Sequence, residues 1–350
     1  MIPKRLPTVR EIAKASGFSI HTVSFALRDH PRASKAAREK IQQIAKEMGW
    51  KPNPMVSAYM AHFRATKEPS FQSSLGFLVS SAASGQIAGL PVYQRRFYQG
   101  AEERGAALGY SLQPIWLHEP GLTSARLTQI LRSRGIRGLI VPSLIDPTEI
   151  LEGLDWSQFA AVAGGYMPRK PILDKVSGHL IHGVHLLLRK ALELGYQRIG
   201  VIFSKNIDDR MDHGVFYPIY YEQKQKARAQ RIKYHCYTWP LTTSGESGIR
   251  KWIEREKPDI VIGQPLALSI LQEMKWDIPE DVAFAAIEWS PDKPQIAGLN
   301  QMQELRGAMA VDLVSAELLR NETGIPAAPK LLLVEGHWED GASAPPRAAV

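Results

Sequence analysis

The chain has 350 residues, of which 44% are hydrophobic, and a net charge of +8, so it is long enough for a small module followed by two mid-sized domains. Its apolar runs fall short of the about 18 residues needed to span a bilayer, and residues 1–7 contain no apolar signal segment, which predicts a cytoplasmic protein with no membrane partner. The single cysteine, Cys236, excludes an intramolecular disulfide and a cysteine-based zinc site.

The positive charge is concentrated near the N-terminus. Residues 1–67 contain thirteen Lys and Arg residues against four Asp and Glu residues, a net charge of +9, so residues 68–350 sum to −1. Binding to a polyanion such as DNA requires a cationic segment of this kind.

The same segment predicts three short helices. Thr8 can cap the first helix, and Gly17 interrupts its apolar periodicity where a tight turn needs positive φ. Ser19 begins a second short helix, and a third helix runs from Ser34 to a stop at Gly49. Two short helices joined by a glycine-containing turn are typical of a helix-turn-helix, whose second helix can enter the DNA major groove.

The strings VREIAKASGFSIHTVSFAL and ASKAAREKIQQIAKEMGWKPNP resemble the headpiece of the LacI/GalR (lactose-repressor-like) transcription regulators. That family has the pattern T-[ILV]-x-[DE]-[VI]-A-x-x-A-G-V-S-x-x-T-V-S, followed by a third helix that ends in G-[YW]-x-P-N, and the match extends over about 50 residues. The DNA-contacting residues that this resemblance implies are Thr8, Ser19, Ile20, His21, Thr22, Ser24, Phe25, Arg28, Arg32, Ser34, Asn53, Ser57 and Tyr59.

Within this set, the resemblance implies that Ile20, His21 and Phe25 face base edges, while Thr22 and Ser24 hold phosphates. The family often has Arg or His where Phe25 stands. An aromatic ring cannot make a bidentate bond to guanine, but it can pack on a thymine methyl group. The alternative for Phe25 is a place in the headpiece core.

Residues 53–60 resemble the family's hinge helix, which folds when two protomers meet on operator DNA and wedges a leucine into the minor groove. Tyr59 stands at the leucine position, and Met60 is an alternative wedge. A passive tether is the other interpretation of this segment. Residues 65–74 are polar and are predicted to form a linker.

From residue 74 onward, short apolar runs alternate with amphipathic stretches. Predicted strands are Leu75–Ser80, Ser111–Leu117, Gly138–Pro142, Phe159–Ala163, Arg198–Phe203, Tyr234–Trp239, Ile260–Gln264, Val282–Glu288 and Leu331–Val334. Predicted helices are Gln94–Leu108, Thr123–Arg134, Gly183–Leu194, Gly214–Gln230, Ser247–Glu256 and Gln303–Leu319. This alternation predicts an α/β fold with parallel sheets covered on both faces, in two domains.

Two strings in this region, LELGYQRIGVI and IPEDVAFAAIEW, resemble the family's sensor region, which has the periplasmic-binding-protein type I fold. The resemblance implies a ligand cleft between two lobes, at the carboxyl ends of the strands. The predicted boundaries are 1–52 for the headpiece, 53–73 for the hinge helix and linker, 74–340 for the two-lobed effector-binding and dimerisation domain, and 341–350 for a flexible tail. Lobe 1 is predicted at about 74–175 plus 304–340, and lobe 2 at about 176–303.

The matching strings also imply an effector site. Its predicted residues are Tyr93, Gln94, Phe97, His179, Arg210, Trp239, Gln264, Glu288 and Gln301. Arg210 and Trp239 fit the recognition of a polyol, because a guanidinium offers several donors to hydroxyls and an indole offers a face to the ring. The family has an Asp at position 179 and an Asn at position 263, so two hydroxyl acceptors are missing here. The effector is therefore a sugar or another small molecule, and a regulator without an effector is an alternative.

Two clusters contain metal-ligating side-chain types: His179, His182 and His185, and Asp208, Asp209, Asp212 and His213. Neither shows the spacing of a closed zinc site, so the sequence predicts no metal and no cofactor. The chain also lacks a G-x-G-x-x-G after a strand, a Walker loop and a G-x-S-x-G elbow, which predicts that it is not an enzyme.

These observations predict a cytoplasmic, homodimeric repressor that binds a pseudopalindromic operator in double-stranded DNA and responds to a small-molecule effector. The alternatives are a soluble small-molecule-binding protein without regulatory activity and an enzyme that uses the acidic cluster near Asp208. The sequence does not give the operator, the identity of the effector, its action as inducer or corepressor, or the choice between dimer and tetramer.

Overall fold

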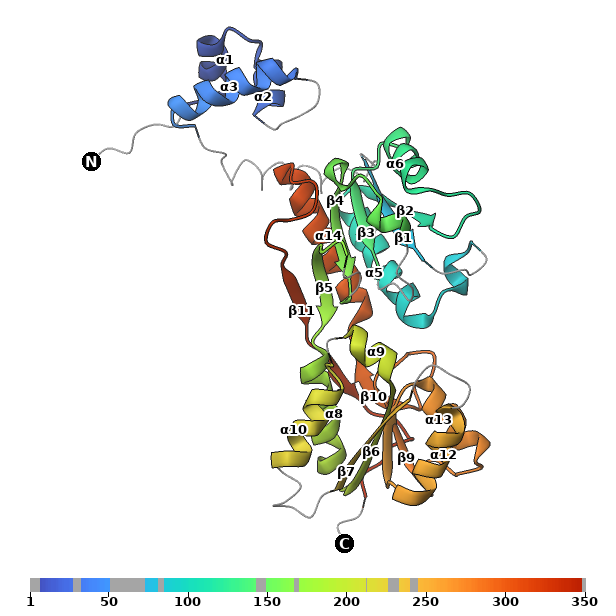
Figure 1. Ribbon diagram of the computed structural model, residues 1–350. Helices are drawn as coiled ribbons and strands as arrows, with labels where there is room; N and C mark the ends of the chain where they lie inside the picture. Colours follow the sequence, from blue (N-terminus) through green and yellow to red (C-terminus); the bar gives the residue numbers. More distant parts are fainter. Residues whose placement is uncertain are drawn as a thin grey trace, which may run out of the picture.

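The computed structural model describes residues 7–27, 33–50, 73–80, 85–142, 149–166, 170–211, 213–225, 233–239 and 245–347 (Figure 1). The N-terminal part contains α1 (Val9–Ser16), α2 (Ile20–Ala26) and α3 (Lys35–Glu47). No helix in the described part of the chain combines the length and apolar character needed to cross a membrane.

Each headpiece helix begins at a hydroxyl-bearing residue that caps it. Thr8 and Glu11 form a reciprocal capping box on α1, in which the Thr8 backbone N–H donates to the Glu11 carboxylate at 2.6 Å. Ser19 and Ser34 accept hydrogen bonds from the first turns of α2 and α3. Gly17 adopts a φ of +74° between α1 and α2, as the predicted turn requires. The three predicted helices are therefore confirmed.

The headpiece has its own small apolar core. Ile12, Val23 and Ile41, one from each helix, are fully buried together. The exposed faces of α1 and α3 are largely polar, whereas α2 exposes Ile20, and each helix buries one apolar stripe against the other two.

The body contains two six-stranded sheets, and the predicted α/β class with parallel strands is confirmed. The first sheet has the order β11-β5-β4-β3-β1-β2. Its strands are β1 (Ser73–Val79), β2 (Tyr110–Trp116), β3 (Gly138–Val141), β4 (Ala160–Gly164), β5 (Asp174–Gly178) and β11 (Leu331–Val334). The second sheet has the order β12-β10-β9-β8-β6-β7. Its strands are β6 (Arg198–Ser204), β7 (Lys233–Trp239), β8 (Ile260–Gly263), β9 (Ala283–Ala286), β10 (Ala297–Asn300) and β12 (His337–Glu339).

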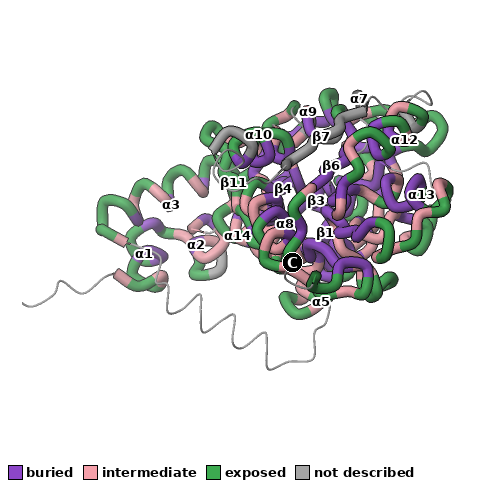
Figure 2. Tube along the Cα trace, turned by 90° about the horizontal axis from the view of Figure 1, so that it is seen from below, coloured by how far each residue is buried: buried purple, intermediate pink, exposed green. Residues whose placement is uncertain are grey.

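Helices cover both faces of each sheet. Around the first sheet lie η1 (Ile87–Gly89), α5 (Val92–Ala107), α6 (Ser124–Ser133), α7 (Glu149–Glu152), η2 (Trp156–Gln158) and α14 (Gln303–Arg320). Around the second lie α8 (Leu180–Glu193), α9 (Lys205–Arg210), α10 (Phe216–Gln225), α12 (Gly245–Glu256) and α13 (Pro265–Glu273). Successive residues of β1 illustrate the layering, because Phe77 packs with α5 and α14 while Leu78 packs with α6. Figure 2 shows the central strands β1, β3, β4 and β6 as buried.

Three strands of the structure, β5, β10 and β12, were not predicted from the sequence. Their sequences, DKVSG, AGLN and HWE, are short and contain at most one β-branched residue each, unlike β6 (RIGVIFS) and β8 (IVIG). The β12 strand pairs antiparallel with β10, through Gly298↔Glu339 and its neighbours, and so belongs to the second sheet. The predicted assignment of residues 304–340 to lobe 1 is therefore wrong for 337–340, and β5 extends the first sheet beyond the predicted lobe boundary at about 175.

The predicted flexible tail is also wrong for residues 341–347. The Ser343 hydroxyl donates to the Phe284 carbonyl at 2.6 Å and accepts from the Ala297 N–H at 2.9 Å, so it links β9 to β10. Arg347 forms an ion pair with Asp259 at 3.1 Å. The small and proline-rich composition that suggested a tail instead allows this segment to pack closely against the second sheet.

Close contact between α5 and α14 depends on two glycines. A Cβ at Gly307 would overlap the carbonyl oxygen of Phe97, and one at Gly100 would overlap the carbonyl of Glu304. Because these neighbours are backbone atoms of the facing helix, a side chain at either position would have to push the helices apart.

We predict that Gly307→Ala lowers the free energy of unfolding by about 1–3 kcal/mol or more, because the added methyl group overpacks this contact. Urea denaturation measures the change. Gly105→Ala on α5 is the control, since its nearest neighbour would be the Tyr110 carbonyl oxygen at 3.6 Å. That control is expected to be neutral or to stabilise by about 0.5–1 kcal/mol. Equal effects of the two substitutions would contradict the importance of close helix packing at Gly307.

Asp174, the first residue of β5, and Glu317 on α14 form a buried acidic pair. Glu317 accepts from the Ala161 N–H at 3.1 Å, and Asp174 forms an ion pair with Lys330 at 2.7 Å. Burial, together with the neighbouring Asp174 carboxylate, raises the pKa of Glu317 to about 7.

The raised pKa makes a testable prediction about stability. The folded protein binds a proton at Glu317 over a pH range, from about 4.5 to about 7, in which the unfolded chain has released it. The wild-type protein should therefore lose stability relative to Glu317→Gln as the pH rises through this range. Urea denaturation of both proteins at about pH 5 and about pH 8 tests this sign, and a constant difference between the two proteins would contradict it.

Candidate functional site

The candidate DNA-binding surface is the exposed side of α2. Ile20, the first residue of this helix, is 46% exposed although it is a large apolar residue. Ser19 accepts from the Thr22 N–H at 3.1 Å, and its hydroxyl lies 2.8 Å from that of Thr22. An exposed apolar residue beside two hydroxyls offers a contact for a thymine methyl group and donors for a phosphate.

Phe25 occupies an intermediate position. It is half-buried and packs against the headpiece core, as the alternative interpretation of this residue requires, while part of the ring remains accessible. Ser24 is likewise half-buried. The backbone of His21 lies in α2, and its side chain is outside the described residues.

Thr8, Ser19 and Ser34 share a structural role, since each caps a headpiece helix, and each is exposed. The predicted DNA contacts Arg28, Arg32, Asn53, Ser57 and Tyr59 lie outside the described residues, as does the alternative wedge Met60. Cationic side chains that the sequence analysis did not single out surround the described headpiece: Arg10, Lys14, Lys35, Lys40 and Lys46 are exposed, and Arg38 is half-buried.

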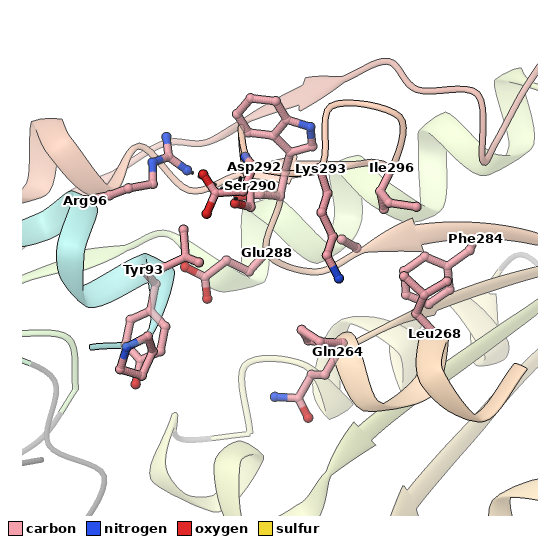
Figure 3. A pocket seen from close by; sticks show the side chains of 15 residues that line it. Tyr93, Arg96, Gln264, Leu268, Phe284, Glu288, Ser290, Asp292, Lys293 and Ile296 are labelled. Atoms are coloured by element: carbon pink, nitrogen blue, oxygen red, sulfur yellow. Dashed lines mark hydrogen bonds between the residues drawn. The ribbon is translucent and has the colours of Figure 1, made fainter. Parts of the chain in front are cut away.

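The candidate ligand site is a cavity of about 470 Å³ between elements of the two sheets (Figure 3). The first turns of α5 contribute Pro91, Val92, Tyr93 and Arg96 to its wall. The second sheet and its loops contribute Gln264, Pro265, Leu268, Phe284, Ala286, Glu288, Trp289, Ser290, Asp292, Lys293 and Ile296. The volume lies within the range of about 300–1,000 Å³ that is usual for small-molecule sites.

Three of the predicted effector residues, Tyr93, Gln264 and Glu288, line this cavity. The Glu288 carboxylate accepts from the Gln303 side chain at 2.6 Å. Burial raises the pKa of Glu288, and the neighbouring Arg306 guanidinium opposes this shift. The carboxylate is thus an acceptor in a largely desolvated wall of the cavity.

The other described effector candidates do not line the cavity. Phe97 packs in the core of the first sheet, 6.2 Å from Phe77 between ring centroids, and Gln94 is buried. Gln301 donates to the Ile287 carbonyl at 3.1 Å. His179 lies beside Glu335, with 3.8 Å between Nδ1 and Oε1. The backbones of Arg210 and Trp239 lie in α9 and β7, and their side chains are outside the described residues.

Several lining residues were not predicted from the sequence. Trp289 follows the carboxyl end of β9, the usual place for ligand contacts in a parallel sheet, so its position in the chain was an available signal. Leu268 and Ile296 gave no such signal, because isolated apolar residues in sequence resemble core residues. Arg96 is held by an ion pair to Glu304, with Nε 2.5 Å from Oε1, and its guanidinium lies 5.7 Å from the Trp289 ring.

The acidic cluster near Asp208 has a structural explanation. Asp208 is buried, and its Oδ1 accepts from the backbone N–H groups of Val215 and Phe216 at 3.0 and 3.2 Å. Its Oδ2 lies 3.1 Å from His213. The carboxylate thus fixes the start of α10, which is the role of a helix cap.

Comparisons with known proteins agree with this arrangement. Residues 8–53 match the family model of bacterial regulatory proteins, lacI family. The HTH-type transcriptional regulator DegA of Bacillus subtilis (strain 168) is 22% identical over 200 residues, which cover 56% of this chain and 55% of DegA. The match therefore spans about half the length of this relative.

Solved structures share the fold over nearly the whole chain. A complex of the transcriptional regulator CelR with cellobiose matches with a TM-score of 0.59 and 20% identity, over 96% of this chain and 99% of that one. The lac repressor dimer bound to operator and the anti-inducer ONPF matches with a TM-score of 0.54 and 14% identity, over 97% and 99%. The fold is a LacI-type helix-turn-helix joined to an α/β body with parallel sheets. The resemblance to the LacI/GalR family that the sequence predicts is confirmed.

Proposed function

We propose that the protein is a sequence-specific transcriptional repressor that binds a pseudopalindromic operator. Its affinity for the operator rises or falls when a small molecule occupies the cavity. The observation that carries this proposal is the coincidence of three features in one short segment. The lacI family match, the exposed face of α2 and the surplus of Lys and Arg residues all fall within residues 1–67. A cationic helix-turn-helix supplies both the phosphate contacts and the helix that reads bases.

The proposed functional state is a homodimer. One headpiece contacts only a half-site, and two headpieces related by two-fold symmetry are needed for a pseudopalindrome. The lac repressor structure, a dimer bound to operator, supports this arrangement for the present chain. The proposed domain boundaries are 1–52 for the headpiece, 53–73 for the hinge and linker, and 74 onward for the body, and the proposed location is the cytoplasm.

The cavity supports a ligand that presents hydroxyl groups together with an apolar face. Its wall combines Glu288 as acceptor and Lys293 as donor with the indole of Trp289. The CelR complex contains cellobiose, which supports a carbohydrate as the proposed effector class. We assign no catalytic role to the chain, since the Asp208 carboxylate is engaged in capping α10.

The operator contacts can be tested on duplexes selected from a random pool. Ile20→Ala should relax sequence preference and cost about 1–3 kcal/mol on the selected site, because a base contact is lost. Arg32→Ala should weaken binding to all sequences similarly and reduce the salt slope by about one. Gel-shift titrations over a series of salt concentrations measure both effects.

The matched control is Arg126→Ala, which removes an exposed arginine from α6 in the body and should change neither quantity. The same selection returns the half-site, its symmetry and its spacing. A full chain that binds no duplex at low ionic strength would refute the proposed function. An asymmetric selected site would refute the homodimer.

The effector cavity can be tested with a panel of mono- and disaccharides that includes cellobiose, scored by thermal shift. For any sugar that binds, Glu288→Gln and Lys293→Ala should weaken binding about tenfold or more, because a charge-assisted hydrogen bond is worth about 1.5–3 kcal/mol. Operator binding without sugar should stay unchanged. Lys251→Ala, an exposed lysine on α12, is the control.

Two outcomes would contradict the sugar site. A sugar that binds equally well to all variants occupies another place, and a panel without any binder removes carbohydrate as the effector class. In the second case operator binding would still stand, and the chain would be an effector-independent DNA-binding regulator or one with a different ligand.

A further inference from the structure

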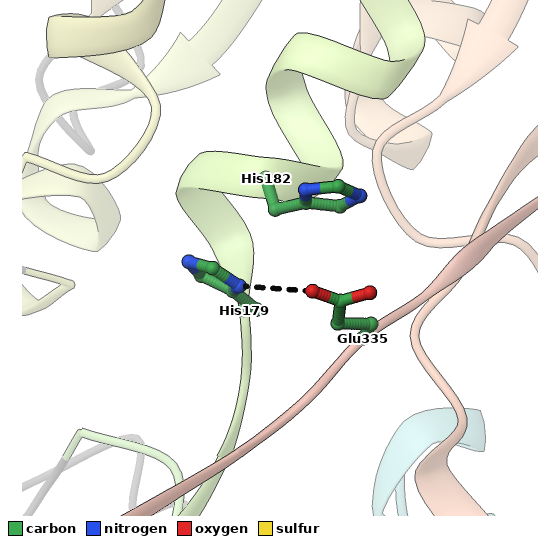
Figure 4. Close-up of side chains that lie close together, drawn as sticks. All are labelled: His179, His182 and Glu335. Carbon is green, nitrogen blue, oxygen red and sulfur yellow. Dashed lines mark ion pairs between the residues drawn. The ribbon is translucent and has the colours of Figure 1, made fainter.

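A cluster of two histidines and a glutamate lies where the chain passes between the two sheets (Figure 4). His179 follows β5 and begins α8, and His182 lies one helical turn further on. Glu335 follows β11 in the segment that leads to β12. None of the three lines the ligand cavity described above.

Backbone pairing places these residues next to each other. The last pair in the register of β5 and β11 is Gly178↔Val334, so the next residue on each strand is His179 or Glu335. The His179 N–H donates to the Val334 carbonyl at 2.9 Å and extends this pairing. Because residues three apart share a helix face, His182 projects from α8 on the same side as His179. The arrangement therefore follows from the fold rather than from a chance contact between mobile side chains.

The three side chains converge on one point. Their candidate ligand atoms all lie within 4.8 Å of one another, and His179 Nδ1 is 3.8 Å from Glu335 Oε1. The imidazole rings of His179 and His182 are stacked, with 5.5 Å between centroids and 27° between planes. Ligand atoms around a tetrahedral zinc ion are about 3.3 Å apart, so binding requires the atoms to approach one another by up to about 1.5 Å. The Glu335 side chain, which is 66% exposed, is free of steric confinement and can make this movement.

We propose that His179, His182 and Glu335 bind a divalent transition-metal ion of the Zn²⁺ type. Two imidazole nitrogens and one carboxylate oxygen are donors that zinc and its neighbours in the first transition series prefer, whereas Mg²⁺ and Ca²⁺ prefer oxygen ligands alone. Water completes the coordination shell, since the His179 side chain is 35% exposed. An ion bound here links the start of α8 to the segment between β11 and β12, and so joins two of the places where the chain passes between the sheets.

No metal was predicted at His179, His182 and His185 because these residues lack the spacing of a closed zinc site. In the structure, His185 lies one turn beyond His182, and its Nδ1 is 3.3 Å from a carboxylate oxygen of Glu222 on α10. Glu335, and not His185, is the third residue of the cluster. It comes from a segment remote in the chain, and pairing of β11 with β5 brings it there.

Isothermal titration calorimetry of the metal-free full chain, without any polyhistidine tag, tests the proposal with ZnCl₂ and MgCl₂ in separate titrations. We expect one Zn²⁺ per chain at this site and no measurable Mg²⁺ binding. Glu335→Gln and His182→Ala should each weaken Zn²⁺ binding at least about tenfold, because even groups that only support a ligand cost about 10–100-fold when removed. His185→Ala is the matched control and should bind Zn²⁺ like the wild type.

Co²⁺ gives an independent readout, because its visible d–d bands report the ligand field and coordination geometry. The spectrum of the bound ion should be lost in His182→Ala and kept in His185→Ala. Far-UV circular dichroism and thermal melting without metal establish that each variant is folded, and His182→Gln replaces His182→Ala if the latter unfolds. The proposal fails if the wild type shows no saturable Zn²⁺ binding, or if Glu335→Gln and the His182 variant bind as tightly as the wild type. A loss in His185→Ala equal to that in His182→Ala would place the ion elsewhere and also overturn it. These measurements need neither operator nor effector, so their outcome is separate from that of the proposed function.

Discussion

The pairing of β11 with β5, followed two residues later by the pairing of β12 with β10, is the constraint on which the architecture of the body depends. The chain leaves the edge strand β11 of the first sheet and enters the edge strand β12 of the second after only two residues. This short segment therefore holds the edges of the two sheets close together. Together with the links before α8 and α14, this gives three passages between the sheets in the described part of the chain. The two sheets therefore meet along one side, and the ends of several strands gather there. Ligand sites in parallel sheets form at such ends, which explains why the cavity and the His179 cluster both lie in this region.

The net charge differs between the N-terminal segment, residues 1–67, and the rest of the chain. Residues 68–350 have a net charge of −1, so the net positive charge of the chain comes entirely from residues 1–67, whose net charge is +9. Coulomb attraction to DNA falls off within about 10 Å at moderate ionic strength, so charge on the body could add little to a headpiece contact. The concentration of Lys and Arg in 1–67 therefore favours one end of the molecule as the nucleic-acid surface. It leaves the body free to use its polar groups for a small ligand.

The sequence predicted the helices of the headpiece well, because the caps and turn that define them depend on residues close together in the chain. The caps Thr8, Ser19 and Ser34 and the turn at Gly17 each act within a few residues, and the structure shows each in its predicted role. The strands β5, β10 and β12 were missed for the opposite reason. They are short and weakly apolar, and partners far away in the chain hold them in the sheets.

The cavity shows the same division between local and distant information. Tyr93, Gln264 and Glu288 were predicted because a resemblance marked their positions, and all three line the cavity. Nothing in the sequence marked Leu268 or Lys293, since a ligand-facing leucine or lysine resembles any core leucine or surface lysine. Residues 341–347 were predicted to be flexible from their composition, but their packing against the second sheet determines their structure. Ser343 is buried and forms hydrogen bonds with Phe284 and Ala297, and no sequence pattern near residue 343 predicts these contacts.

The first turn of α14 connects the cavity to the first sheet. Gln303 donates to Glu288, and Glu304 accepts from Arg96, so two residues of the cavity wall are bonded to this one turn. Burial lowers the pKa of Arg306 and the nearby Glu288 carboxylate opposes the shift, so each charge offsets part of the desolvation cost of the other. A ligand that competes for Glu288 must replace the Gln303 hydrogen bond and leave Arg306 a charged partner. Removing that partner would leave a buried arginine without a compensating charge, which is costly. Because Gly307 lets α14 pack directly against the backbone of α5, the same helix joins the wall of the cavity to the first sheet, which directly follows the headpiece and linker in the chain.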